Sequence, residues 1–327
     1  MKEAFRDRYG PPDVVGLREV PVPEPGEGEL LVRVRAASVN RADLDGLKPK
    51  PGFVRLFLGF RAPRSHGIGG DVAGVVESVG AGVTRFKPGD EVFGDLFGES
   101  DGAFAEYVRA PEKAFEPMPP GMSFDEASTL PHSAILALQA MRLRKGGSVK
   151  PGDRVLIVGA SGNVGPFAVQ IAKAMGAEVT GVASTDKLDM VRSLGADHVL
   201  DYSKVNPTRT GERYDWIVDM DSYLSLFGVR RALKPGGAYV TLGGGTGTIL
   251  LALAVGPLIS LFSDKWTGLL MWWKPWHRPD IERLKELIAA GQLKPVIDRR
   301  YPLTDVVAAL RHVDEGRARG KVIITFD

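Results

Sequence analysis

The chain has 327 residues, 44% hydrophobic and 25% charged, a profile typical of a globular protein large enough for two domains. Its formal net charge is +2 and it has no block of like charges, so nothing indicates a nucleic-acid partner or a polybasic membrane anchor. Cysteine is absent, which excludes disulfides, thiolate zinc sites and a cysteine nucleophile. The first ten residues lack the apolar core of a signal peptide, so we expect a cytoplasmic protein.

The N-terminal third of the chain is rich in predicted strands. Residues 28–40 alternate apolar and charged side chains, and residues 71–79 read as a second strand. The segment 86–90, Phe-Lys-Pro-Gly-Asp, predicts a turn into a short strand at 91–93. Strands separated by Gly/Pro turns indicate a mainly β domain.

From residue 123 onward, strands alternate with helices. Ser123 and Glu126 form a capping-box signal at the start of a helix predicted over 127–141. This alternation predicts a doubly wound parallel sheet in an α/β protein. The later predicted elements are strands at 154–158, 178–183, 198–200, 216–218 and 238–242, and helices at 166–175, 186–194 and about 222–233.

The C-terminal part is too small to form a domain alone. It contains predicted helices at 279–290 and 304–313 and a strand at 321–325, so we expect it to fold back onto the first domain. The predicted division is a strand-rich domain from 1–120 and 275–327, and an α/β domain from 121–274.

The strand at 154–158 runs into a glycine-spaced turn, GASGNVG at 159–165, before a helix. Free backbone N–H groups and the helix dipole at such a turn bind a pyrophosphate. The spacing is GxxGxxG, so an ordinary βα turn and methyltransferase-type nucleotide binding remain alternatives. The predicted cofactor-binding residues are Gly159, Ser161, Gly162, Asn163, Val164, Gly165, Ser184, Lys187, Tyr202, Leu242 and Gly243, with Asn40 from the first domain.

The end of the second strand of this domain favours NADPH over NADH. Ser184 and Thr185 follow the strand, where an NAD site would place a carboxylate for the ribose hydroxyl. Lys187 lies close behind and suits a 2′-phosphate. Asp186 is the counterargument, although an acid at a helix start also favours the helix dipole.

Several further motifs follow one another along the chain: ASVNRAD at 37–43, GGDVAGVV at 69–76, FKPGDEVFG at 86–94, GAFAEYV at 102–108 and GADHVLDY at 195–202. In this order they resemble the medium-chain dehydrogenase/reductase superfamily, specifically its zinc-free quinone oxidoreductase (zeta-crystallin-like) branch. The resemblance covers nearly the whole chain and implies a GroES-like catalytic domain (1–120 and 275–327) and a Rossmann NADPH-binding domain (121–274), an active site in the interdomain cleft, and a homodimer. Asn163 stands where this branch usually has glycine, but asparagine tolerates unusual backbone angles.

Zinc-dependent members of the superfamily place metal ligands at positions that here read Asn40, Gly70-Asp71 and near His132. Only His132 could bind a metal in the same way, and the four-cysteine structural-zinc lobe is also missing. The resemblance therefore implies an enzyme without catalytic zinc, for which ordinary alcohol oxidation is not expected.

The chemistry implied by the resemblance is hydride transfer from NADPH to an electrophile that needs little activation, such as a quinone. We expect Asn40 to contact the substrate or the nicotinamide, with a turn-capping amide as the alternative. Asp43 could orient Asn40 or cap a helix, and His132 could donate a proton or be structural.

A tyrosine proton donor is not evident in the sequence. Related enoyl reductases use a tyrosine, but residues 41–65 contain none, which leaves Tyr107 and Tyr223 as distant options. We interpret His66 as a surface loop residue and His198 as structural.

We therefore predict a zinc-independent, NADPH-dependent oxidoreductase that reduces a quinone-type acceptor. An NADPH-dependent enone or enoyl reductase is the alternative enzyme. A non-catalytic NADPH-binding protein, crystallin-like or redox-sensing, is the alternative of another class.

The most apolar part of the chain is residues 249–262 together with four tryptophans. Gly256-Pro257 interrupts this segment, and it is too short to cross about 30 Å of hydrocarbon. It could form a dimer interface, a lid over an apolar substrate, or, less favoured, a membrane-surface contact. The tryptophans are Trp266, Trp272, Trp273 and Trp276, and the residues that could form an opposite wall are Phe53, Arg55, Phe57 and Phe60.

Overall fold

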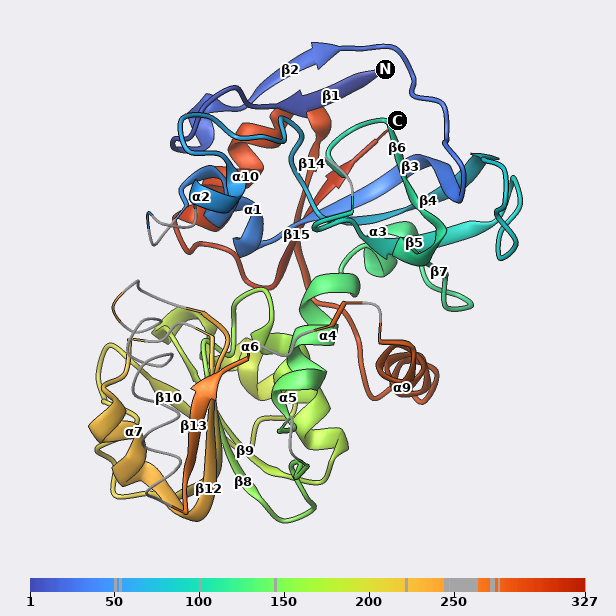
Figure 1. Cartoon of the computed structure of the whole chain (residues 1–327). Coiled ribbons are helices and arrows are strands. Elements are labelled where there is room, and N and C mark those ends of the chain that lie inside the picture. Colours follow the sequence, from blue (N-terminus) through green and yellow to red (C-terminus); the bar gives the residue numbers. More distant parts are fainter. Residues whose placement is uncertain are drawn as a thin grey trace. The chain divides into compact units, whose positions relative to one another are not determined.

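The computed structural model describes residues 1–49, 52, 55–99, 102–143, 146–220, 223–243, 247, 264–270, 274–275 and 277–326. The chain divides into two compact units: unit 1 is Met1–Ser133 with Pro295–Asp327, and unit 2 is Ala134–Lys294 (Figure 1). The apolar segment 249–262, Phe53 and three of the tryptophans (Trp272, Trp273 and Trp276) lie outside the described residues, so the interpretations of that region stay predictions.

Unit 2 contains a six-stranded sheet in the order β10-β9-β8-β11-β12-β13, and every neighbouring pair is parallel. Counted from β8 as the first strand, the order is 3-2-1-4-5-6, that of doubly wound dinucleotide-binding sheets. The predicted parallel sheet is therefore confirmed. Its strands are β8 (Arg154–Val158), β9 (Glu178–Ala183), β10 (His198–Asp201), β11 (Tyr214–Asp219), β12 (Leu233–Thr241) and β13 (Trp266–Leu269).

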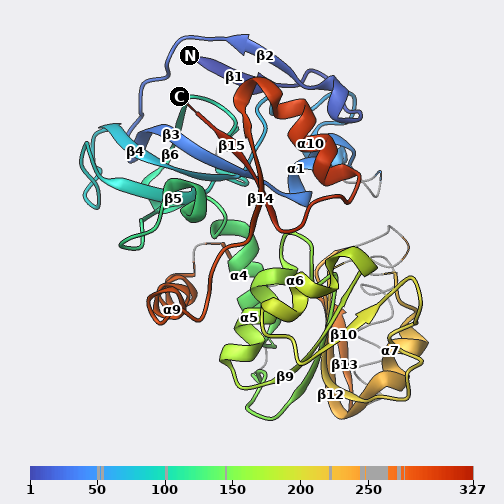
Figure 2. The ribbon, with the colours of Figure 1, turned by 180° about the vertical axis from the view of Figure 1, so that it is seen from behind.

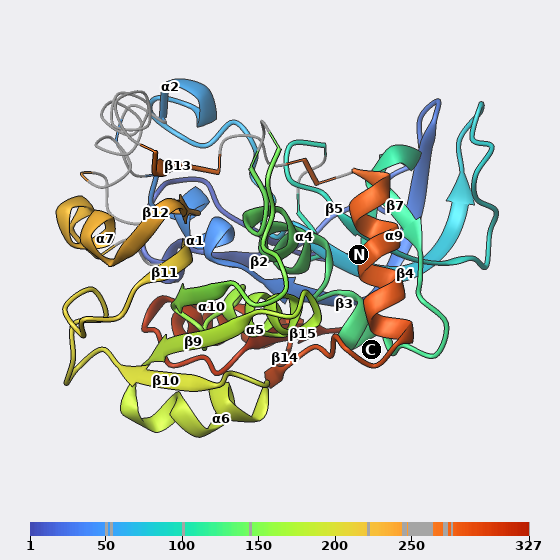
Figure 3. The ribbon, with the colours of Figure 1, turned by 90° about the horizontal axis from the view of Figure 1, so that it is seen from below.

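Helices pack along this sheet because its strands are apolar on both faces. Helix α5 (Gly165–Ala174) packs on β8 and β9, and α6 (Leu188–Ser193) packs on β9 and β10 (Figure 3). Helix α7 (Leu226–Ala232) contacts β12, and α9 (Arg278–Ala289) also belongs to unit 2. None of the helices in the described ranges combines the length and the apolar composition that crossing a bilayer requires.

Most predicted elements differ from the structure only by a few residues at their ends, and two differ more. The helix predicted over 127–141 is two helices, α3 (Phe124–Ala127) and α4 (Pro131–Ala140), because proline lacks an N–H and disfavours helix in the residue before it. The predicted capping box is confirmed, since Glu126 N donates to Ser123 Oγ and Ser123 N donates to Glu126 Oε2. Strand β12 starts at Leu233, before the strand predicted at 238–242, and its register against β11 shifts between Tyr214 and Trp216.

Unit 1 is built on a seven-stranded sheet in the order β14-β15-β3-β4-β5-β7, with β6 also paired to β3. Helix α10 (Val306–Asp314) packs on β14 and β15 (Figure 2), while α1 (Arg41–Leu47) directly follows β3, and α2 covers Arg55–Leu58. The strands are β3 (Glu29–Val39), β4 (Asp71–Val79), β5 (Glu91–Asp95), β6 (Tyr107–Pro111), β7 (Phe115–Pro117), β14 (Ile297–Pro302) and β15 (Lys321–Thr325), with β1 (Lys2–Phe5) and β2 (Gly16–Glu19) as a separate antiparallel pair.

The register of this sheet aligns the strand ends that carry its buried polar residues. Val322 of β15 pairs with Val39 of β3, and the neighbouring Ser38 pairs with Asp71 of β4. Asp71 in turn pairs with Asp95 at the end of β5. One edge of the sheet therefore gathers residues that are far apart in the sequence.

The turn after β8 generates a test of the fold. A Cβ on Gly165 would lie 2.2 Å from the Gly159 carbonyl oxygen and 2.5 Å from the Ala160 carbonyl carbon, both backbone atoms. We expect Gly165→Ala to destabilise the protein by about 1–3 kcal/mol, the usual cost of overpacking. Gly162→Ala is the matched control, because its nearest neighbour would be 3.6 Å away. Thermal unfolding checks this, and equal melting temperatures for the two variants would contradict it.

Candidate functional site

The glycine-spaced turn of unit 2 lies directly after the central strand β8. Gly159 has a φ of +80°, which glycine adopts without strain, and Gly162 N donates to its carbonyl at 3.1 Å. Ala160 N donates to Val182 O at 2.9 Å and holds the turn against β9. Helix α5 starts at Gly165, and the first N–H groups of a helix have no partner within it. The turn thus has the form expected of a pyrophosphate cradle.

The other predicted cofactor residues follow the neighbouring parallel strands. Ser184 comes after β9, Tyr202 after β10, and Leu242 and Gly243 after β12. They therefore lie at the carboxyl edge of the sheet, where doubly wound folds bind ligands beside the point at which the strand order reverses. Here that point is between β8 and β11. The structure brings the predicted residues to one edge, and cofactor binding by them stays a prediction.

The region after β9 contains carboxylates as well as hydroxyls. Ser184 Oγ donates to Asp186 Oδ1 at 2.7 Å, and the Thr185 hydroxyl donates to the Asp201 carboxylate. Hydrogen bonds from Ser203 and then Thr185 lower the pKa of Asp201 to about 2, so it is an anion. Lys187 is only 9% exposed. The local charge is therefore mixed.

The edge of the unit 1 sheet holds a buried ammonium group. Lys321 is 1% exposed, and its Nζ donates to Asn40 Oδ1 at 2.6 Å and to Ser133 Oγ at 3.0 Å. The same Nζ lies 3.4 Å from Asp71 Oδ2. Burial lowers the pKa of Lys321, although the negative charges of Asp71 and Asp43 oppose that effect.

Asn40, the expected substrate contact, is buried within this cluster. Its Nδ2 donates to Asp71 Oδ2 at 2.9 Å, and its Oδ1 accepts from Lys321 and, at 3.2 Å, from Ser133 Oγ. Because an ammonium group only donates, the amide oxygen must face Lys321. Protein groups therefore fix the orientation of Asn40, and its direct contact with a substrate or nicotinamide stays a prediction.

Asp43 both caps helix α1 and contributes a titratable group. Its Oδ2 accepts the backbone N–H of Asn40 at 2.6 Å, while its Oδ1 is buried without a hydrogen-bond partner. Burial raises the pKa of Asp43 to about 7, with a further contribution from the charge of Asp71, against the lowering effect of the Asn40 hydrogen bond. Near neutral pH this carboxyl group is therefore partly protonated.

His132 lies in the first turn of α4, next to two carboxylates. Its backbone N donates to Asp71 Oδ1 at 3.0 Å, and its ring Nδ1 lies 3.3 Å from Asp95 Oδ2. Burial by itself lowers the pKa of His132, but the hydrogen bond to Asp95 and the charges of Asp95 and Asp71 raise it above its ordinary value. The side chain is 14% exposed, and its ring centre is 5.0 Å from that of Phe97.

The sequence interpretation missed four members of this cluster: Asp71, Asp95, Ser133 and Lys321. One signal was a charged residue at the end of an apolar strand, as in Lys321 before Val322, and another was that Asp71 stands at a metal-ligand position of zinc-dependent members. Charged side chains are rarely buried unless paired, but the sequence did not indicate which strands would be neighbours.

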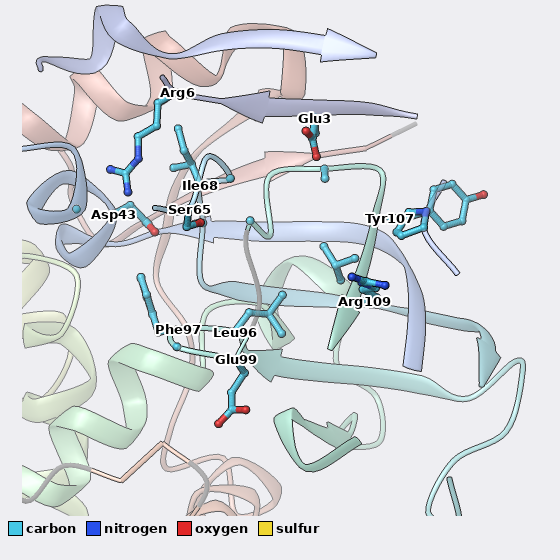
Figure 4. A pocket seen from close by; sticks show the side chains of 18 of the residues that line it. Glu3, Arg6, Asp43, Ser65, Ile68, Leu96, Phe97, Glu99, Tyr107 and Arg109 are labelled. Carbon is cyan, nitrogen blue, oxygen red and sulfur yellow. The ribbon is translucent and has the colours of Figure 1, made fainter. Parts of the chain in front are cut away.

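A cavity of about 920 Å³ lies in unit 1 next to this cluster (Figure 4). Asp43 and Phe97 line it, so the cavity adjoins the buried polar cluster at Asp43. Further lining residues are Arg6, Ser65, Ile68, Leu96 and Tyr107.

The remaining candidates lie elsewhere on the surface. His66 pairs with Asp7 and His198 with Glu178, and both rings are substantially exposed. Tyr223 is exposed, and its ring centre is 6.2 Å from that of Tyr202. Across the described ranges, no three His, Cys, Asp or Glu side chains are grouped so as to hold a metal ion.

The raised pKa of Asp43 predicts how stability depends on pH. The folded protein holds this proton up to about pH 7, whereas an unfolded chain releases it near 3.8, so the group destabilises the fold as pH rises between these values. Asp43→Asn keeps an acceptor for the Asn40 N–H but does not titrate. We therefore expect its melting temperature to fall less than that of the wild type between about pH 5 and pH 8.

The control is Asp45→Asn on the same helix, where the side chain is 61% exposed. Circular dichroism melting curves measure the effect. The assignment would be wrong if Asp43→Asn lost as much stability over this pH range as the wild type.

Comparison with known proteins supports the two-part architecture. The model of the alcohol dehydrogenase GroES-like domain matches residues 26–120, and the zinc-binding dehydrogenase model matches residues 194–324. The structure of a quinone oxidoreductase from Coxiella burnetii is 27% identical, with a TM-score of 0.86, and the alignment covers 100% of this chain and 99% of that one.

Two curated relatives are similar over most of their length. The chloroplastic quinone-oxidoreductase QR1 of Triphysaria versicolor is 34% identical, over 99% of this chain and 98% of the relative. The trans-enoyl reductase pgmF of Aspergillus terreus is 33% identical, over 92% of this chain and 87% of the relative. The predicted combination of a GroES-like domain and a Rossmann domain is confirmed. The chain is an oxidoreductase of the medium-chain dehydrogenase/reductase superfamily and belongs to its quinone oxidoreductase branch.

Proposed function

We propose that the protein is an NADPH-dependent, zinc-independent oxidoreductase that reduces a quinone-type acceptor. The observation that carries this proposal is the glycine turn at the point where the strand order of a six-stranded parallel sheet reverses. The names of the Triphysaria and Coxiella relatives favour a quinone as the acceptor.

The residues of unit 2 fit a dinucleotide. Gly165 allows α5 to start within van der Waals distance of Gly159. Within the described part of the chain, a Cβ at Gly162 or Gly243 would meet nothing closer than 3.6 Å, which leaves room for a ligand to approach the backbone there. A bound nicotinamide would supply the hydride for reduction. The protein supplies the turn that binds the pyrophosphate and the strand ends that orient the rest.

The proposed independence from zinc rests on Lys321. Its ammonium group lies among Asn40, Asp71 and Ser133, and so supplies the positive charge that balances Asp71. A metal ion at this place would meet an ammonium group that already uses these oxygens, and like charges so close repel strongly.

Enone or enoyl reduction is the second candidate, favoured by the similarity to the trans-enoyl reductase of Aspergillus. Enone reduction would use the same hydride and would also need a proton donor. The non-catalytic NADPH-binding alternative does not agree with the relatives, which are named as an oxidoreductase and a reductase. The homodimer and the cytoplasmic location stay predictions, and the Triphysaria relative is described as chloroplastic.

The first experiment follows NADPH absorbance with a small ortho-quinone in the presence of EDTA, with NADH in a parallel reaction. We expect rapid loss of NADPH that EDTA does not slow and a slower loss of NADH. NADPH binding without turnover of the quinone would contradict the proposed acceptor, and inhibition by EDTA would contradict independence from metal.

A second experiment tests the choice between the two nicotinamides. Lys187→Gln removes a positive charge while nearly keeping the side-chain length, and should weaken NADPH binding about tenfold or more, as expected for a lost charged hydrogen bond, but leave NADH nearly unchanged. Asp186→Asn is the matched variant and should act in the opposite direction by removing a negative charge. Fluorescence titration measures both dissociation constants. Equal weakening of the two cofactors by Lys187→Gln would remove the 2′-phosphate role.

A further inference from the structure

The segment between α1 and β4 in unit 1 has an uneven distribution of charge. Residues 46–70 contain five Lys or Arg residues and no Asp or Glu, although acidic residues make up 40 of the 327 in the chain. The cations are separated by apolar residues, as in RLFLGFRAPR at 55–64, so the sequence shows no block of like charges. We call residues 55–64 the Gly59 tip. It is both cationic and apolar.

A tight turn at Gly59 brings the two halves of the tip together. Gly59 has a φ of +118°, and a Cβ there would lie 2.0 Å from the Ala62 carbonyl oxygen and 3.1 Å from the Arg64 backbone N. Gly59 N donates to Arg55 O at 2.9 Å, directly after α2 (Figure 1). Arg61 lies within the turn. The backbone therefore gathers the three arginines of the tip around one glycine.

Contacts with the N-terminal segment hold the tip in place. Tyr9 Oη donates to Gly59 O at 2.8 Å, and the Arg55 guanidinium lies 4.8 Å from the centre of the Tyr9 ring, a cation–π contact. Arg6 N donates to His66 O at 2.9 Å and fixes the chain just after the tip. The tip thus presents a supported surface.

The tip exposes large apolar side chains beside its charges. Leu56 is 61% exposed and Phe60 is 72% exposed. The three arginines of the tip are exposed as well. Contact with a partner would remove the apolar surface from water, which is favourable in free energy.

The positive charge of the tip is not balanced locally. Within the described ranges, none of its three arginines has a carboxylate at ion-pair distance, whereas the neighbouring Lys48 pairs with Asp314 at 2.6 Å. Asp7, in the supporting N-terminal segment, faces His66 at 3.2 Å. The surface is therefore complementary to an anionic partner.

We propose that the Gly59 tip docks onto the surface of a membrane that contains anionic lipids. The arginines bind lipid phosphates, while Leu56 and Phe60 enter the boundary of the acyl chains. A lipid surface suits this combination better than an acidic protein, because it accepts a protruding apolar tip without a complementary pocket. The contact is peripheral, and it does not depend on the proposed enzymatic function.

The experiment mixes the full chain with vesicles of phosphatidylcholine, either alone or together with phosphatidylserine, and measures partitioning by co-sedimentation. We expect binding only to the vesicles that contain phosphatidylserine, and loss of binding at high salt, because salt screens the attraction. Replacing two arginines, Arg61→Gln with Arg64→Gln, should lower the partition coefficient about 30-fold, since each cation near an anionic surface contributes about 1 kcal/mol.

The matched control is the double variant Arg209→Gln with Arg299→Gln. It removes the same charge from two exposed positions that, within the described ranges, also have no carboxylate at ion-pair distance. It should change the partition coefficient little, and melting temperatures verify that both double variants fold. Equal losses in the two would overturn the inference, because the net charge and not the tip would then govern binding.

A second readout locates the contact. The chain has no cysteine, so Phe60→Cys provides a single site for an environment-sensitive fluorophore. Its emission should shift to the blue on phosphatidylserine vesicles, whereas a label at Phe227→Cys, where the phenylalanine is 86% exposed on α7, should stay hydrated. Soluble phosphoserine should not displace the bound protein.

Three results would overturn the inference. The first is no binding to phosphatidylserine vesicles, and the second is a label at position 60 that stays hydrated in the bound protein. The third is displacement by phosphoserine, which would assign a small anion to the tip instead of a membrane. Binding to soluble heparin without binding to vesicles would likewise assign an acidic macromolecule.

Discussion

The contact between the Lys321 ammonium and the groups around Asp71 determines the arrangement of the site in unit 1. Asp71 accepts hydrogen bonds from Ser38, Asn40 and the His132 backbone, and Lys321 offsets its charge. A buried carboxylate without such partners would cost several kcal/mol. The pairing therefore fixes how the ends of β3, β4 and β15 and the start of α4 meet, and with them the orientation of the Asn40 amide.

The site in unit 2 depends on a different constraint, the close passage of backbone at a turn. At Gly165, helix α5 comes too close to Gly159 to leave room for a side chain. This keeps the helix N-terminus at the carboxyl edge of the sheet, where the strand order reverses. The site in unit 1 thus depends on the pairing of buried charges, whereas the turn in unit 2 depends on a glycine that has no side chain.

These two kinds of constraint explain what the sequence could predict. The glycine turn and the strand–helix alternation are local patterns. The parallel sheet, and the turn at the carboxyl end of its central strand, were therefore predictable from the residues themselves. The cluster in unit 1 depends on pairings between distant strands, and a single sequence does not show that Lys321 will lie beside Asn40. The break at Pro131 was a local signal, but the apolar run around it obscured it.

The separation of 281 residues between Lys321 and Asn40 has a consequence for how the protein is made. During synthesis, β3 and β4 emerge early, while the ammonium group that compensates Asp71 arrives only after all of unit 2 has been translated. Unit 2 is continuous in sequence and needs no such wait, so it can fold first as a domain on the ribosome. Until β15 is in place, the buried edge of the first sheet must stay hydrated. Completion of unit 1 therefore has to wait until Lys321 has been translated, after unit 2.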